Sequence, residues 1–117
     1  MKEQAMTDAS EIARKTAKRL SPKYGDALPL TVEKTIHGAA GKPGQFIDIA
    51  TLVVAALIVR CAHLAFEWRK SKGGAGKPDV EVLKLELRLE LGRPEGISEK
   101  TRDDVIDAVA EETEGEE

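Results

Sequence analysis

The pattern of apolar and polar residues is organised around one stretch, residues 45–70, which is the most apolar segment of the chain. It contains an uncharged run of eleven residues, 49–59, which is bounded by Asp48 and Arg60. Beyond this run, charged residues return at helical spacing, so one side of the segment stays apolar while the other becomes polar. The apolar side carries Val54, Leu57, Cys61, Leu64 and Trp68. The pattern predicts a long central helix that is amphipathic in its second half and buried on all sides in its first half.

The apolar first half of this helix must be covered by protein or by lipid. A membrane span needs about 20 mostly apolar residues, whereas a run of about 10 to 14 is more often a buried core helix. The eleven-residue run therefore favours the core of a soluble protein. The alternative is a membrane-associated protein in which residues 46–59 insert and nearby cations hold the interface. The residues of this half that we expect to contact a partner or a membrane are Ile49, Leu52, Val53 and Leu57.

Two shorter segments alternate apolar and polar residues with the period of a β-strand. In residues 28–36, the large apolar residues stand at even-numbered positions: Leu28, Leu30, Val32 and Ile36. In residues 83–91, every second residue is leucine and charged residues stand between them. We therefore predict two strands, one before and one after the central helix in the sequence. The connection between them is long enough for a parallel crossover.

The two ends of the chain are predicted to be helical. Thr7 or Asp8 can cap a first helix, which we expect to end at Ser21 and Pro22. We interpret the basic residues of this helix as a face exposed to solvent. Ser98 can cap a last helix after a glycine-rich turn at residues 92–96. The predicted fold is thus a small α/β (α+β) domain of order α-β-α-β-α with a two-stranded parallel sheet. It occupies residues 7–112, between a flexible tail at 1–6 and an acidic disordered tail at 113–117.

Composition narrows the classes of function. The net charge of −3 gives no basic excess that would point to nucleic acid as a partner. The single cysteine, Cys61, excludes an internal disulfide. Together with an N-terminus that does not resemble a signal peptide, this indicates a cytoplasmic protein. If residues 46–59 insert into a membrane, the expected location is the inner membrane. The glycine-rich segment at 38–44 lacks the phosphate-loop motif, because Pro43 follows Gly41-Lys42. We therefore expect no cofactor.

The candidate chemistry lies on the polar side of the central helix. Arg60, His63, Glu67 and Lys70 fall on one face, and His63 and Glu67 are close enough in sequence to hydrogen-bond across a turn. A small enzyme would use His63 as a base oriented by Glu67. The simpler interpretation is a solvent-facing side that serves as an interaction face. Two histidines and one cysteine are too few ligands for a zinc site without help from carboxylates or a second chain. We expect no catalytic residues and no metal site.

One family resemblance rests on the central segment. It is carried by Lys42-Pro43-Gly44-Gln45, by the apolar helix that follows, and by Phe66-Glu67-Trp68-Arg69-Lys70 at the end of that helix. A predicted strand and an acidic helix come next. This arrangement resembles the effector-associated constant component family of bacterial conflict systems. The resemblance covers roughly residues 28–112 and departs at Asp48 and in the turn at 92–96. It implies a strand that continues into a short hairpin, and a non-enzymatic adaptor in a defence operon.

The sequence therefore predicts a non-enzymatic adaptor that acts by protein–protein contact. Because the edges of a two-stranded sheet can pair with another chain, we expect a protein partner or a homo-oligomer. A membrane-active protein that inserts residues 46–59 is the alternative function, and a small enzyme is a third.

Overall fold

Every regular element that the structure describes is an α-helix. The computed structural model describes residues 2–38, 49–72, 80–94 and 96–115. Within these ranges the chain forms five helices and no strand: α1 (Lys2–Tyr24), α2 (Leu28–Ile36), α3 (Ile49–Lys72), α4 (Val80–Leu91) and α5 (Glu99–Gly115). The predicted α/β fold with a two-stranded sheet is therefore wrong. The expectation that sheet edges drive association loses its basis with it.

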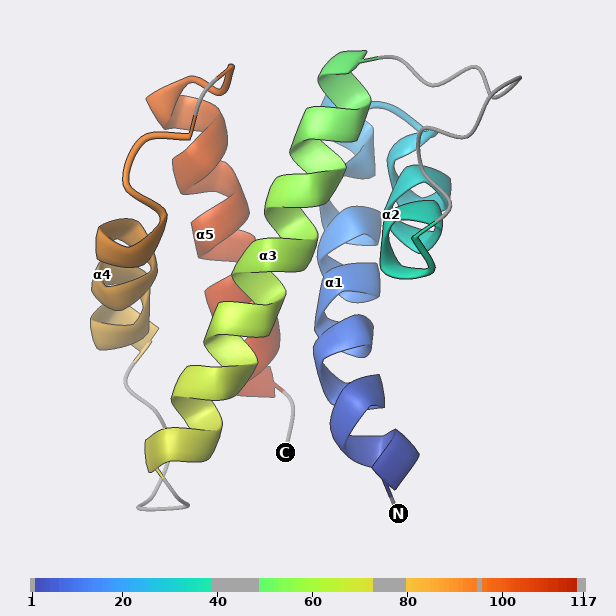
Figure 1. Ribbon diagram of the computed structural model, residues 1–117. Coiled ribbons are helices and arrows are strands. Elements are labelled where there is room, and N and C mark those ends of the chain that lie inside the picture. The colour runs from blue at the N-terminus through green and yellow to red at the C-terminus, as the bar shows by residue number, and fades with distance from the viewer. Residues whose placement is uncertain (1, 39–48, 73–79, 95, 116–117) are drawn as a thin grey trace.

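The long helix α3 is the centre of the bundle, and the prediction of a central apolar helix is confirmed. It crosses in front of α1 and α5, with α2 on one flank and α4 on the other (Figure 1). It contacts all four other helices, whereas α4 packs only on α3 and α5. The position of Asp48, just before α3, lies outside the described residues.

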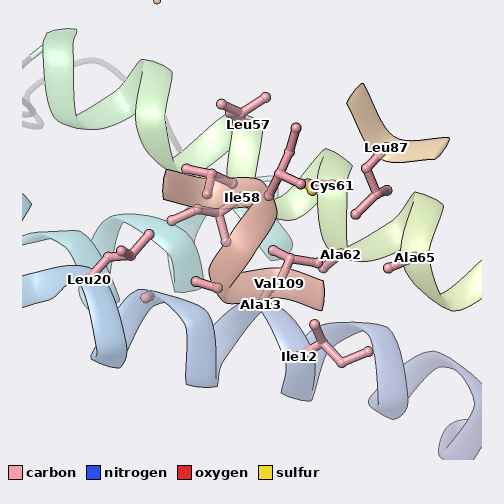
Figure 2. Close-up of a cluster of buried hydrophobic side chains, with 14 of the residues drawn as sticks. Ile12, Ala13, Leu20, Leu57, Ile58, Cys61, Ala62, Ala65, Leu87 and Val109 are labelled. Carbon is pink, nitrogen blue, oxygen red and sulfur yellow. The ribbon is translucent and has the colours of Figure 1, made fainter. Parts of the chain in front are cut away.

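The core lies where α1, α3 and α5 meet. The small residues Ala55, Ala62 and Ala65 of α3 are buried there, and small side chains at a contact allow two helices to pack closely. Larger side chains fill the remaining space, with Ile12 of α1 and Ile58 of α3 fully buried. Figure 2 shows Ile12, Ile58, Ala62 and Ala65 together with Leu87 of α4 and Val109 of α5. Most residues of this core are aliphatic.

Residues 28–36, predicted as a strand, form helix α2. Pro29 stands in its first turn, where a missing N–H costs no hydrogen bond. The buried residues Leu28, Thr31 and Val32 follow the helical spacing i, i+3 and i+4. The hydroxyls of Thr31 and Thr35 each donate to the carbonyl four residues earlier, at 2.8 Å, so both threonines are accommodated in the helix. Leu30, which the strand would have placed inside, is exposed.

Residues 83–91, also predicted as a strand, form most of helix α4. A leucine at every second position contains two series of leucines spaced four apart, and each series follows one side of a helix. Leu83, Leu87 and Leu91 face the core, while Leu85 and Leu89 face solvent. Leucine, glutamate, lysine and arginine are all good helix formers, so local preference supports the helix. Gly92 ends α4 in the left-handed conformation, with its N–H donating to the Arg88 carbonyl at 2.9 Å.

Both terminal helices are longer than predicted. Helix α1 begins at Lys2 and continues through Pro22 to Tyr24, so neither the cap at Thr7 or Asp8 nor the stop at Ser21-Pro22 is observed. The Ser21 hydroxyl donates at 3.2 Å to the Lys18 carbonyl, the group that Pro22 cannot reach because it has no N–H. Helix α5 starts as expected, with the Ser98 hydroxyl accepting from the Thr101 N–H at 3.1 Å.

The helices also extend into both predicted tails. Residues 2–6 belong to α1, and α5 continues to Gly115. Thr113, assigned above to an acidic tail, is fully buried, and its hydroxyl donates to the Val109 carbonyl at 2.7 Å. Helical structure therefore continues beyond residues 7–112 at both ends, and Thr113 is packed in the core.

Ion pairs join α1 to its neighbours along the edge of the core. Arg14 contacts Glu33 of α2 with two guanidinium nitrogens. Arg19 contacts Glu111 at 2.5 Å and Glu112 at 3.0 Å, both on α5. Arg14 and Arg19 thus connect helices, where the sequence suggested only a solvated basic face.

Candidate interaction surface

The structure places the four charged residues of the predicted interaction face on the outer side of α3. Arg60, His63, Glu67 and Lys70 are all exposed. In the described part of the chain, no hydrogen bond or ion pair joins Arg60, His63 or Glu67 to another residue. The ammonium group of Lys70 lies 5.7 Å from the centre of the Phe66 ring. His63 and Glu67 are therefore separate side chains on a helix surface, and the hydrogen bond considered between them is not formed.

The four apolar candidates of α3 divide into two groups. Ile49 is 75% exposed, and Leu52 and Val53 are half-buried. Leu57 is only 5% exposed and belongs to the core, so it cannot contact a partner or a membrane in this fold. The expectation that residues 49–59 are buried on all sides is also wrong, because Ile49, Ala50 and Ala56 are exposed. The outer side of α3 is apolar in its first half and charged in its second.

Cys61 is not available for chemistry in the folded protein. Its side chain is fully buried, as its place on the apolar side predicted. Burial away from water raises the pKa of the thiol to about 12, so it stays protonated at neutral pH. Among the described residues, no cluster of three or more histidine, cysteine, aspartate or glutamate side chains could hold a metal ion.

Helix α4 exposes an apolar stripe that the sequence analysis missed. Val82, Leu85 and Leu89 are 44%, 53% and 70% exposed, and we call these three residues the outer stripe. Their spacing, i, i+3 and i+7, places them in one line along the side of α4 that faces away from the core. The signal was present in the sequence as leucines spaced four apart. It was hidden because the strand assignment put all five leucines on one side.

A groove lies beside the outer stripe, between α3 and α4. Its volume is about 350 Å³, and its lining combines three apolar residues with three carboxylates. The apolar residues are Leu64, Trp68 and Leu87, and the carboxylates are Glu67, Glu86 and Glu90. We call this feature the acidic groove. In the described part of the chain, none of its three carboxylates forms an ion pair.

The other flank of α4 is electrostatically different. Lys84 lies 3.6 Å from Asp107, and Arg88 lies 3.5 Å from Asp103, both on α5. The cations of α4 are therefore directed toward α5, while Glu86 and Glu90 border the acidic groove on the α3 side. The acidic groove has no cation of α4 to balance it.

Helix α3 also meets the length and composition expected of a membrane span. The segment Ile49–Lys70 is long and apolar enough to cross a bilayer, and 33% of its most apolar window is buried inside the bundle. A core helix of a soluble protein satisfies the same criteria.

Comparisons of the chain with known protein families, with curated proteins and with solved structures return no match. The strand that the family resemblance implied over residues 83–91 is helix α4. The assignment of a function therefore depends on the surfaces described above.

Proposed function

We propose that this chain is a non-enzymatic adaptor module that binds a partner protein through the outer stripe of α4. One observation carries the proposal: three large apolar side chains, Val82, Leu85 and Leu89, lie in line on the exposed side of a helix whose opposite side is already buried. Apolar residues at i, i+3 and i+7 are the contacts by which an amphipathic helix docks on another protein.

The energetics of this stripe favour association. Removing apolar surface from water contributes roughly 25 cal/mol per Å², so three exposed aliphatic side chains leave an appreciable driving force unused. The groove between α3 and α4 extends the surface next to the stripe, and its lining includes the large ring of Trp68. A tryptophan beside aliphatic residues is a common composition for the centre of a binding surface.

Affinity capture from the source cells tests the proposal. The wild type and the double variant Leu85→Glu/Leu89→Glu are compared with Leu30→Glu, which adds a charge at an exposed leucine of α2. We expect the same partner with the wild type and with Leu30→Glu, and its loss with the double variant, while circular dichroism shows all three to be folded. A partner held equally by all three proteins, or by none, would contradict the proposal.

A membrane-associated role is the second candidate, supported by the apolar length of α3 and by the exposure of Ile49. Insertion of α3 would have to remove Ile58, Cys61 and Ala65 from the core, which dismantles the bundle. Flotation with vesicles of phosphatidylethanolamine and phosphatidylglycerol tests this role. The adaptor proposal expects the folded protein to remain in the unbound fraction.

The biological setting is proposed from the resemblance of the central segment alone. An adaptor in a bacterial conflict system would couple a sensor or a protease to an effector through contacts of this kind. The genes that neighbour this one provide the test, because defence components encoded beside it would supply both partners.

A further inference from the structure

We infer that the partner presents a cationic amphipathic helix, which lies along α4 with its apolar residues on the outer stripe and its lysines or arginines against the acidic groove. This inference rests on the proposed binding function and adds the chemistry of the partner.

The arrangement of α4 places the two features side by side. At about 100° per residue, Glu86 and Glu90 fall between the outer stripe and the side of α4 that faces the core. They are four residues apart and so lie along the same edge, about 6 Å apart in rise. Glu67 lines the groove from α3. A helix docked on the stripe therefore has carboxylates along one flank.

The charge of this flank selects the partner. Glu86 and Glu90 form no ion pair in the described structure and lie together on one edge of α4, so a cationic flank would meet negative charge there. Glu67 adds a third carboxylate from a face of α3 that also carries Arg60 and Lys70. The basic residues of α4 cannot serve, because Lys84 and Arg88 are directed toward α5. The Trp68 ring and Leu64 supply apolar contact for the stems of long cationic side chains.

The same charge argues against a second copy of this chain in an antiparallel, two-fold contact. Two α4 helices that meet in this way through the outer stripe place equal flanks opposite each other, so Glu86 and Glu90 would face the same glutamates of the second copy. Like charges in this position oppose the contact. A partner with a basic flank has no such conflict.

The test uses two synthetic helical peptides as probes. Both carry leucine at i, i+3 and i+7; one has lysines on the flanks and the other has glutamates at the same positions. The only tryptophan of the protein, Trp68, lines the groove, so its fluorescence reports on binding at this site. We expect the lysine peptide to shift the Trp68 emission, with an affinity that falls as salt is added, and the glutamate peptide to bind far more weakly.

Variants of the groove complete the experiment. Glu86→Gln/Glu90→Gln is expected to weaken the lysine peptide roughly tenfold without loss of helicity. Asp26→Asn/Glu99→Gln removes the same charge at exposed positions away from the groove and is expected to bind like the wild type. Equal binding of both peptides, or unchanged affinity in the Glu86→Gln/Glu90→Gln variant, overturns the inference.

Two further results separate this inference from the proposed function. If the cellular partner is lost from Leu85→Glu/Leu89→Glu but retained by Glu86→Gln/Glu90→Gln, the adaptor function stands and the cationic partner is refuted. If sedimentation of the protein alone shows a dimer that Leu89→Glu abolishes, the stripe binds a second copy and the inference fails.

Discussion

The two sides of helix α4 carry the same residue type at the same spacing but lie in different environments. Leu83 and Leu87 on the inner side are each 1% exposed and Leu91 is 8% exposed, whereas Leu85 and Leu89 on the outer side are 53% and 70% exposed. Local sequence does not distinguish the two lines of leucines. The inner line is buried because α3 and α5 pack against it, and the described chain supplies no element that covers the outer one.

The charges beside these leucines differ in the same way. Lys84 and Arg88 approach carboxylates of α5, so they support the fold. Glu86 and Glu90 have no such partner in the described residues. One side of α4 is therefore covered by α3 and α5, whereas the other presents exposed leucines and glutamates that form no ion pair in the described residues.

The largest predicted effect is a difference in the free energy of unfolding between substitutions on the inner and outer sides of α4. Leu87→Ala should lower the free energy of unfolding by about 2–4 kcal/mol, because it leaves a cavity in a fully buried site. Leu89→Ala should change it by less than about 0.5 kcal/mol, because the side chain is already in water. Urea denaturation followed by circular dichroism measures both. Similar losses in the two variants would contradict the assignment of inner and outer sides.

A second prediction concerns a buried hydroxyl group in the core. The hydroxyl oxygen of Thr16 in α1 is fully buried and has no hydrogen-bond partner among the residues that the structure describes. Thr16→Val keeps the shape and removes this unsatisfied group, so it should raise the free energy of unfolding by about 1 kcal/mol. Thermal denaturation compares it with Thr113→Val. That control should be destabilising, since the Thr113 hydroxyl donates to the Val109 carbonyl.

A smaller effect is expected at the contact between α1 and α5, and it depends on pH. Hydrogen bonds from Lys23 and Tyr24, each at 2.7 Å, lower the pKa of Asp104 below its usual 3.8. A carboxylate whose pKa is lower in the folded state stabilises the fold above its unfolded pKa and loses that contribution as the pH falls through the folded value.

Asp104→Asn should therefore be less stable than the wild type at pH 7, and the difference should shrink steadily below about pH 4. Denaturation at a series of pH values measures it. A difference that stays constant down to pH 2 would show that the Asp104 charge does not contribute.

The sequence predicted the parts of the fold in which helical spacing and local signals agree. The central helix, the Ser98 cap and the turn at Gly92 are confirmed. Both strand predictions failed because alternation over a short segment also fits helical spacing when residues four apart are apolar, as Leu28 and Val32 or Leu83 and Leu87 are. Pro29 also fits the first turn of a helix, so its presence could not exclude one.

The candidate surface was predicted only in part. The exposure of Arg60, His63, Glu67 and Lys70 follows from the amphipathic pattern of α3, which needs no knowledge of the neighbouring helices. The outer stripe could not be found while residues 83–91 were taken as a strand. The acidic groove depends on how α3 and α4 pack, which no local pattern encodes.

Thiol labelling of single-cysteine variants distinguishes the buried side of α4 from its exposed side. In a Cys61→Ala background, Leu85→Cys, Leu87→Cys and Leu89→Cys are each exposed to a maleimide reagent under native conditions. We expect rapid labelling at positions 85 and 89, and labelling at position 87 only as fast as the protein unfolds. Equal protection at all three positions, as in a strand with every leucine facing the core, would contradict this expectation.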